Sequence, residues 1–377
     1  TSIQDVNYQY YDVGGSLNSV ADGFTMLNLM QSAVKFQQDG YHDQTQSIFA
    51  TAQLGWKSKL YLDVTGRVDW SSALAWTDTK SVAYPSVGVS AILTELLPIK
   101  NNVLTFLKVR GSYSEVGNAP TRYIAYQTYP YESASPVTAT TYPNTDIKPE
   151  RTKAWEVGLQ SHLWNDRLEL NVSLYKTSTY NQLFNPSISA SSGYSSIYIN
   201  GGQVDNKGIE ASLTLNQPLG PVKWNSTFTY TINRNKIKKL LKPTTLSSGE
   251  IVKQDMMDLG GLEIVNSRLF EGGSIGDLYV TALRTDSHGY IDVDYVNNTV
   301  AIDNKAGERQ DGWIYAGNSQ AKYMMGWRNS FSWKGLTLSC LVNARIGGIV
   351  VSQTQAMMDA YGVSTATAEA RDLGYVL

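Results

Sequence analysis

Apolar and polar side chains alternate with a period of two over much of the chain. Between Lys59 and Trp70 the even positions hold Leu, Val, Gly or Trp, while the odd positions hold Lys, Tyr, Asp, Thr or Arg. Because successive side chains of a β-strand point to opposite faces of its sheet, such a stretch predicts a strand with one apolar and one polar face. The alternation recurs in residues 167–177, 209–216, 222–232 and 336–346. We count roughly twelve segments of this kind, which predicts an all-β protein.

The lengths of the predicted strands favour a membrane-spanning barrel over a soluble domain. Many segments have about 10–12 residues, whereas globular strands usually have about 5–6 and tilted membrane strands need about 9–11. Within the segment 167–177 we expect Val172 to face lipid and Ser173 to face the lumen.

Connection lengths also alternate along the chain. Tight turns are predicted at 57–58, 165–166, 218–221 and 334–335. Long polar connections are predicted at 71–80, 114–152, 178–206 and 235–274. An up-and-down transmembrane barrel has short turns at its periplasmic rim and longer loops at its outer rim. We therefore predict that the tight turns share the periplasmic side.

Tryptophan residues mark both ends of the predicted strands. They share the apolar parity of their strands and lie beside short turns (Trp56, Trp224, Trp333) or at long-loop ends (Trp70, Trp155, Trp327). Amphipathic indole rings are favoured at membrane–water interfaces, so the pattern predicts two aromatic belts. The alternative is that these rings belong to the core of a soluble protein.

Composition narrows the class of protein. The chain has 377 residues, a net charge of −2, 17% charged residues and 11% aromatic residues. A balanced charge argues against nucleic-acid binding. No apolar run reaches the length of about 18 residues needed for a transmembrane helix. A single cysteine, Cys340, excludes an internal disulfide framework. A transmembrane β-barrel and a large soluble β-protein remain.

Motifs for catalysis receive little support from the sequence. His42, His162 and His288 lack the spacing of metal ligands. Residues 272–276 match G-x-S-x-G, but the following residues 277–280 predict a strand where a nucleophile elbow requires a helix. We expect a glycine-rich turn there, and we expect the protein not to be an enzyme.

An acidic stretch offers weak candidates for calcium binding. Asp286, Asp292 and Asp294 could supply oxygen ligands, although the EF-hand spacing is absent. A solvated turn is the simpler interpretation, and we otherwise expect no cofactor.

Four tyrosines in the long connection 114–152 are candidates for ligand or partner binding. They are Tyr123, Tyr126, Tyr129 and Tyr131. Aromatic faces beside polar groups suit stacking on sugar rings or contact with peptides. The alternative is a loop that packs on its own tyrosines.

Four motifs, in this order along the chain, resemble those of SusC/RagA-type TonB-dependent outer-membrane transporters. They lie in residues 108–118 (KVRGSYSEVGN), 147–158 (IKPERTKAWEVG), 200–210 (NGGQVDNKGIE) and 313–329, where WIYAGN leads to MGWRN. The likeness runs from about Ser47 to the C-terminal end.

The resemblance implies an antiparallel transmembrane β-barrel of about twenty-two strands, of which residues 1–377 would supply a part. The plug, the TonB box and the terminal strands are expected outside this chain, which we interpret as an internal fragment. Implied partners are outer-membrane lipid, a SusD-like surface lipoprotein, TonB through a region outside the chain, and an oligosaccharide or peptide substrate. By this analogy we favour oligosaccharides.

Two other interpretations remain open at this point. One is a passive porin or adhesin barrel, which needs no plug. The other is a soluble carbohydrate-binding β-sandwich.

Overall fold

The computed structural model describes the chain except for residues 22, 31–34, 130, 133–134, 137–139, 187, 189–192, 246–250, 255, 263–264, 295, 297–298 and 375–377. One antiparallel sheet of eleven strands dominates it, in the order β1-β2-β3-β4-β5-β9-β10-β12-β13-β22-β23. The strands are β1 (Ser2–Gly14), β2 (Lys35–Trp56), β3 (Leu60–Ser71), β4 (Val82–Ile92), β5 (Leu104–Asn118), β9 (Glu150–Leu163), β10 (Leu168–Phe184), β12 (Ile199–Leu219), β13 (Val222–Lys239), β22 (Tyr323–Trp333) and β23 (Leu336–Ile346).

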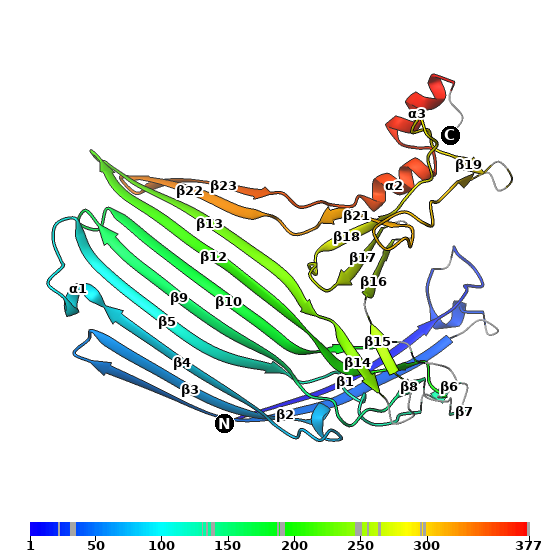
Figure 1. Cartoon of the computed structure of the whole chain (residues 1–377), viewed down its shortest axis with the longest axis horizontal. Helices are drawn as coiled ribbons and strands as arrows, with labels where there is room; N and C mark the ends of the chain where they lie inside the picture. The colour runs from blue at the N-terminus through cyan, green and yellow to red at the C-terminus, as the bar shows by residue number, and fades with distance from the viewer. Residues whose placement is uncertain are drawn as a thin grey trace.

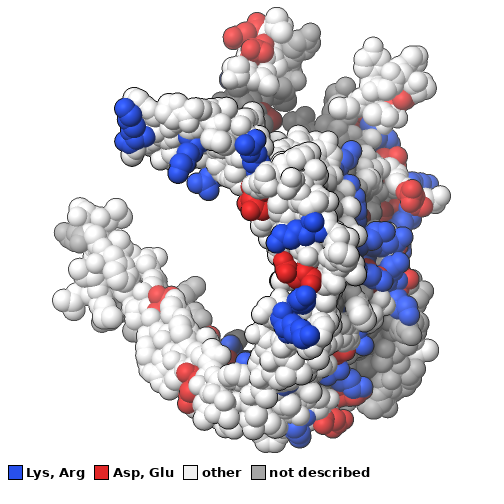
Figure 2. All heavy atoms as spheres, turned by 90° about the vertical axis from the view of Figure 1, so that its left-hand side faces the viewer, with Lys and Arg blue, Asp and Glu red and all other residues white. Residues whose placement is uncertain are grey.

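This main sheet curves into an open trough (Figures 1 and 2). The prediction of a partial antiparallel β-barrel is thereby confirmed, and one curved layer excludes the β-sandwich. Lys, Arg, Asp and Glu side chains line the concave side of the trough in Figure 2.

Strand register keeps apolar side chains together on one face of the main sheet. Val172 lies opposite Leu159 on one side and Ala211 on the other. Ala211 in turn lies opposite Tyr230. On the other face, Ser173 Oγ accepts a hydrogen bond of 2.5 Å from Arg110 Nη2. A shift of one residue would exchange the two faces, so the apolar pattern specifies the register.

The predicted tight turns are present. Lys57 and Ser58 have φ values of 49° and 54°, and two successive positive φ values are typical of hairpin turns whose twist matches that of the strands. In the longer turn between β9 and β10, Trp164, Asn165 and Asp166 have φ values of 54°, 56° and 64°. The remaining turns contain Gly220 and Lys334, with φ values of 61° and 45°.

The strands are longer than the alternation predicts, and two connections are correspondingly shorter. Residues 178–206 were expected to form a loop, but β10 runs on to Phe184 and β12 begins at Ile199. Phe184 and Ile199 still face each other in the ladder. Polar residues occupy both faces in this region, so the period-two signal is lost although backbone pairing continues. The same holds for β13, which ends at Lys239.

Residues 240–322 connect β13 to β22 and contain a second sheet, which we call the insertion sheet. Its strands are β16 (Met256–Leu262), β17 (Val265–Phe270), β18 (Asp277–Thr281) and β21 (Trp313–Asn318), paired in that order. The G-x-S-x-G stretch forms the turn between β17 and β18, with Gly272 at a φ of 88°. That prediction is confirmed, because a strand follows the motif.

Short elements complete the chain. They are η1 (Met26–Asn28), η2 (Ser72–Leu74), α1 (Leu93–Leu96), β6 (Tyr131–Glu132), β7 (Ser135–Pro136), β8 (Thr141–Tyr142), β11 (Ser196–Ile197), β14 (Leu241–Thr245), β15 (Ile251–Gln254), β19 (Val293–Asp294), β20 (Thr299–Val300), α2 (Gln353–Ala360) and α3 (Thr365–Asp372). In the described part of the chain, no helix combines the length and apolar character needed to cross a membrane.

Buried apolar residues gather at the strand ends opposite the tight turns. One cluster contains Phe184, Val204, Ile237, Leu240 and Leu269. Since Leu269 comes from the insertion sheet and the others from β10, β12, β13 and the residue after it, this cluster fastens the insertion sheet to the trough. A second cluster contains Ile188, Ile197, Ile199 and Leu241.

Candidate functional site

The concave wall of the trough carries paired charges and hydroxyl groups. Arg110 Nε lies 3.5 Å from Glu156 Oε1, and Arg110 Nη1 donates to Asn171 Oδ1 over 3.3 Å. Arg110, Glu210 and Ser212 help to line a cavity of about 260 Å³ in this wall. The wall therefore offers hydrogen-bonding groups along its length, as a water-filled or plug-filled lumen requires.

The three predicted tyrosines whose side chains are described, Tyr123, Tyr126 and Tyr129, have different surroundings. Tyr126 stacks on Trp76 with ring centroids 4.6 Å apart. Tyr123 is 51% exposed, has a φ of 65°, and contributes to a cavity of about 560 Å³ beside β1 and β2. Tyr129 is exposed. The side chain of Tyr131 lies outside the described part of the structure.

Arg122 holds this loop against the β1–β2 hairpin. Its Nη2 lies 2.7 Å from Asp43 Oδ2, and its guanidinium lies 3.5 Å from the ring centroid of Tyr41. Tyr41 stacks on Tyr8 at 5.1 Å. The hydrogen bond that Arg122 donates to the Asp43 carboxylate raises the pKa of Arg122, so the contact stays charged. Sequence reasoning missed Tyr41 and Asp43 because their partner is distant along the chain.

The calcium candidates take part in turn and ion-pair contacts. Asp286 Oδ1 accepts hydrogen bonds from the backbone amides of His288 and Tyr290. Asp292 Oδ2 accepts from Arg284 Nε at 2.7 Å. The side chain of Asp294 is outside the described residues. No group of three potential metal ligands occurs among the described residues, so calcium binding stays a prediction without support from geometry.

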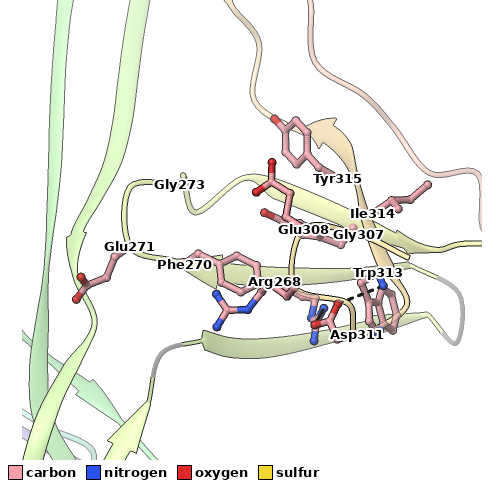
Figure 3. A pocket seen from close by; sticks show the side chains of 12 residues that line it. Arg268, Phe270, Glu271, Gly273, Gly307, Glu308, Asp311, Trp313, Ile314 and Tyr315 are labelled. Atoms are coloured by element: carbon pink, nitrogen blue, oxygen red, sulfur yellow. Dashed lines mark hydrogen bonds and ion pairs between the residues drawn. The ribbon is translucent and has the colours of Figure 1, made fainter. Parts of the chain in front are cut away.

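The insertion sheet contains an aromatic cavity of about 560 Å³, which we call the insertion pocket (Figure 3). Its rings come from Phe270 of β17, Tyr279 of β18, and Trp313 and Tyr315 of β21. Trp313 and Tyr315 lie on the same face of β21, because alternate residues of a strand share one face. Tyr279 lies edge-on to Phe270 at 5.2 Å and to Tyr315 at 5.6 Å. Burial, followed by the charge of Asp277, raises the pKa of both tyrosines, which therefore remain neutral hydroxyl groups at physiological pH.

Arg268 lines the insertion pocket and lies against one of its aromatic rings. It is 6% exposed, and its Nη1 lies 2.9 Å from Asp311 Oδ2. Its guanidinium also lies 5.0 Å from the ring of Trp313, a distance typical of a cation–π contact. A buried cation held by a carboxylate and a ring fixes the relative positions of β17 and β21.

Two neighbouring charged residues at the insertion pocket have no ion-pair partner among the described residues. They are Glu308 and Arg309, both exposed. The guanidinium of Arg309 lies over Phe270, 4.6 Å from the ring centroid. Their polar groups are therefore available to a ligand that enters the pocket.

The sequence analysis did not find the insertion pocket. Residues 235–274 were expected to be a loop, and 313–318 were used only as a motif. The available signal was the spacing of large side chains two residues apart, in Arg268 and Phe270 and again in Trp313 and Tyr315.

Comparisons with known proteins agree with this architecture. Residues 1–343 match the family model described as TonB dependent receptor-like, beta-barrel. The chain belongs to this family. The match begins before Ser47, where we expected it to start, and thus includes the β1–β2 hairpin.

The chain corresponds to only part of the length of its relatives. The chain is 25% identical over 366 residues to TonB-dependent receptor P3 of Formosa agariphila, covering 90% of this chain and 36% of that receptor. It is 25% identical over 312 residues to receptor P26 of the same organism, covering 78% and 31%. The chain thus spans about a third of the length of these relatives.

The fold is similar to that of RagAB structures. A RagAB peptide importer in its "open-open" state has a TM-score of 0.69 and 20% identity, covering 92% of this chain and 38% of that one. A RagAB peptide transporter has a TM-score of 0.66 and 20% identity, covering 90% and 38%. The SusC/RagA-type resemblance is confirmed, and the outer membrane is the location of this barrel.

Proposed function

We propose that this chain forms part of a TonB-dependent importer of nutrient oligomers, with oligosaccharides as the favoured class. A SusD-like surface lipoprotein would assist capture, and TonB would act through a region outside the chain. The observation that carries the proposal is the insertion pocket at the end of the trough opposite the tight turns. We propose neither a catalytic step nor a cofactor.

The chemistry of the insertion pocket suits a sugar ring. A pyranose has an apolar face that an aromatic ring can cover, and Tyr315 offers such a ring with 57% exposure. Hydroxyl groups at the edge of the sugar can bond to Glu308 and Arg309, which are planar polar groups. A volume of about 560 Å³ lies within the usual range for small-ligand sites.

Uptake by the full-length receptor tests this function. In cells whose only copy of the receptor carries Tyr315→Ala and Arg309→Ala, oligosaccharide uptake should fall severalfold at limiting concentration. Tyr290→Ala is the matched control, because Tyr290 is 74% exposed in the same connection and outside the pocket. Unchanged uptake in the double variant, or an equal loss in the control, would contradict the role of the pocket.

Peptide import is the second candidate function. Glu308 and Arg309 could pair with the two charged ends of a short peptide, and the RagAB structures are described as peptide importers. Competition separates the two: a peptide mixture that blocks receptor binding where oligosaccharides do not would favour peptides. Uptake that persists in cells lacking TonB would instead favour a passive porin.

A further inference from the structure

One arginine of the insertion pocket lacks the carboxylate partner that the other arginines of the same connection have. Arg268 Nη1 lies 2.9 Å from Asp311 Oδ2, and Arg284 Nε lies 2.7 Å from Asp292 Oδ2. Arg309 is exposed and lines the pocket, but it has no ion-pair partner among the described residues. Its positive charge is therefore not neutralised within the part of the chain that the structure describes.

The side chain of Arg309 nevertheless has a defined position. Its guanidinium lies over the ring of Phe270, 4.6 Å from the centroid. Stacking uses only the flat face of a guanidinium, so the N–H groups at its edge remain free to donate hydrogen bonds. Part of the side-chain entropy that Arg309 would lose on binding a ligand is thus already lost on folding.

A tight loop presents Arg309 to the insertion pocket. The backbone amide of Gln310 donates to the carbonyl of Gly307 over 3.1 Å. Gly307 has a φ of 86°, and a Cβ atom added there would lie 2.0 Å from the carbonyl oxygen of Trp313. Only glycine fits at this position, and it lets the loop approach β21 closely. The backbone before Arg309 is therefore held against the strand that supplies two of the pocket's rings.

The insertion pocket carries charges of opposite sign on two sides. Arg309 lies at Phe270, whereas the side chain of Glu308 points toward Tyr315 in Figure 3. Burial is the main cause that raises the pKa of Tyr279, and the nearby charge of Glu308 raises it further. A ligand with an anionic group at one end and hydroxyl groups at the other can satisfy both sides in one orientation only.

We propose that the insertion pocket binds an anionic sugar unit, whose carboxylate or sulfate group pairs with Arg309. The proposal rests on the import of oligosaccharides proposed above and names the kind of sugar that this site takes. A guanidinium forms paired, charge-assisted hydrogen bonds with the oxygens of such a group. The apolar face of the same sugar ring can cover Tyr315, and its hydroxyl groups can donate to Glu308.

The competing explanation is that Arg309 only covers the apolar face of Phe270 and extends its charge into water. Loss of the guanidinium would then change the binding of charged and uncharged sugars equally. The two explanations differ in the ratio of two affinities, which can be measured on a single preparation of receptor.

Paired oligosaccharides test the proposal with the purified full-length receptor. One set contains short oligomers of uronic acids and the same oligomers after reduction of their carboxyl groups. The other set contains short sulfated oligosaccharides and their desulfated forms. Isothermal titration calorimetry at low salt should show about tenfold tighter binding of the anionic member in at least one set, because hydrogen bonds to charged groups are strong enough for this ratio. In Arg309→Gln the ratio should fall to about twofold or less.

Two further variants should change the ratio in different ways. Glu308→Gln should increase the preference for the anionic member, because it removes a like charge while its amide oxygen can still accept from hydroxyl groups. An increase cannot result from misfolding. Lys305→Gln should leave the ratio unchanged, since Lys305 is an exposed cation of the same connection that does not line the pocket.

The possible outcomes separate this proposal from the proposed function. An Arg309→Gln receptor that keeps the native ratio would overturn the assignment of the anion to Arg309, and so would equal affinities within both sets for the native receptor. In either case, binding of the neutral oligosaccharides would leave oligosaccharide import standing. A native receptor that binds short peptides and none of the oligosaccharides would overturn both.

Discussion

At the scale of single residues, the sequence predicts which face of the sheet a side chain occupies, because one face meets lipid and has to be apolar. Val172 and Ser173 were assigned to opposite faces because only one face of a barrel strand meets hydrocarbon, and the register places them so. Contacts between distant segments had no such signal. The stacking of Tyr126 on Trp76 and the ion pair of Arg122 with Asp43 depend on how loops fold back. Periodicity does not report such contacts.

A charge on the apolar face should destabilise the barrel strongly. We expect Val172→Arg to lower the free energy of unfolding by about 2–4 kcal/mol, because an arginine near the membrane midplane loses its hydration. Ser212→Arg on the opposite face is the control variant. It is preferred to Ser173→Arg, because the Ser173 hydroxyl already accepts a hydrogen bond from Arg110. Ser212 faces the concave cavity with Glu210 nearby. Denaturant titration in lipid vesicles measures both, and equal losses would refute the register.

Tyr123 lines a cavity beside β1 and β2, where it could contact a ligand or the proposed lipoprotein. Its side chain is half exposed, whereas the Tyr126 ring already stacks on Trp76. Tyr123→Ala should therefore weaken ligand or lipoprotein association severalfold while changing stability by about 0.5 kcal/mol or less. Surface plasmon resonance with the purified receptor, together with a melting curve, would show this. Intact association would leave Tyr123 with a structural role only.

At the scale of elements, turns were predicted well and long connections poorly. Hairpin turns such as 57–58 and 165–166 interrupt two periodic strands, so they are visible in the pattern. The region 178–206 was taken for a loop, because its strands leave the membrane and no longer need an apolar face. Of the four-stranded insertion sheet, the strand at 277–280 was predicted, and β16 and β17 were missed for the same reason.

Accessibility of inserted tags tests the orientation of these elements. A tag at Ser287, in an exposed turn of the connection 240–322, should be labelled on intact cells. A tag at Asp166, in the tight turn between β9 and β10, should be labelled only after the outer membrane is opened. Fluorescent antibody binding in flow cytometry gives the readout. Equal labelling of both sites on intact cells would contradict the periplasmic placement of the turns.

At the scale of the whole molecule, the barrel class followed from strand length, connection lengths and tryptophan positions together. None of these features identifies a substrate, because the trough wall has to satisfy only water, lipid and its own hydrogen bonds. Candidate specificity lies in the insertion pocket, whose residues come from Arg268 to Tyr315 and meet only through the insertion sheet. The fold was therefore predictable from local pattern, and the pocket was not.

The connection between β13 and β22 bears on how such receptors diversify. The conformational entropy lost on closing a loop grows only with the logarithm of its length, by about 0.6 kcal/mol for each doubling. A connection that is already long can gain or lose further segments at little cost to the strands it joins. The residues 240–322 also carry a sheet of their own, which meets the trough through a cluster that includes Leu269 and through hydrogen bonds between residues 272–275 and β13. The proposed insertion pocket can thus be exchanged at this position together with its sheet, while the surrounding wall keeps its register.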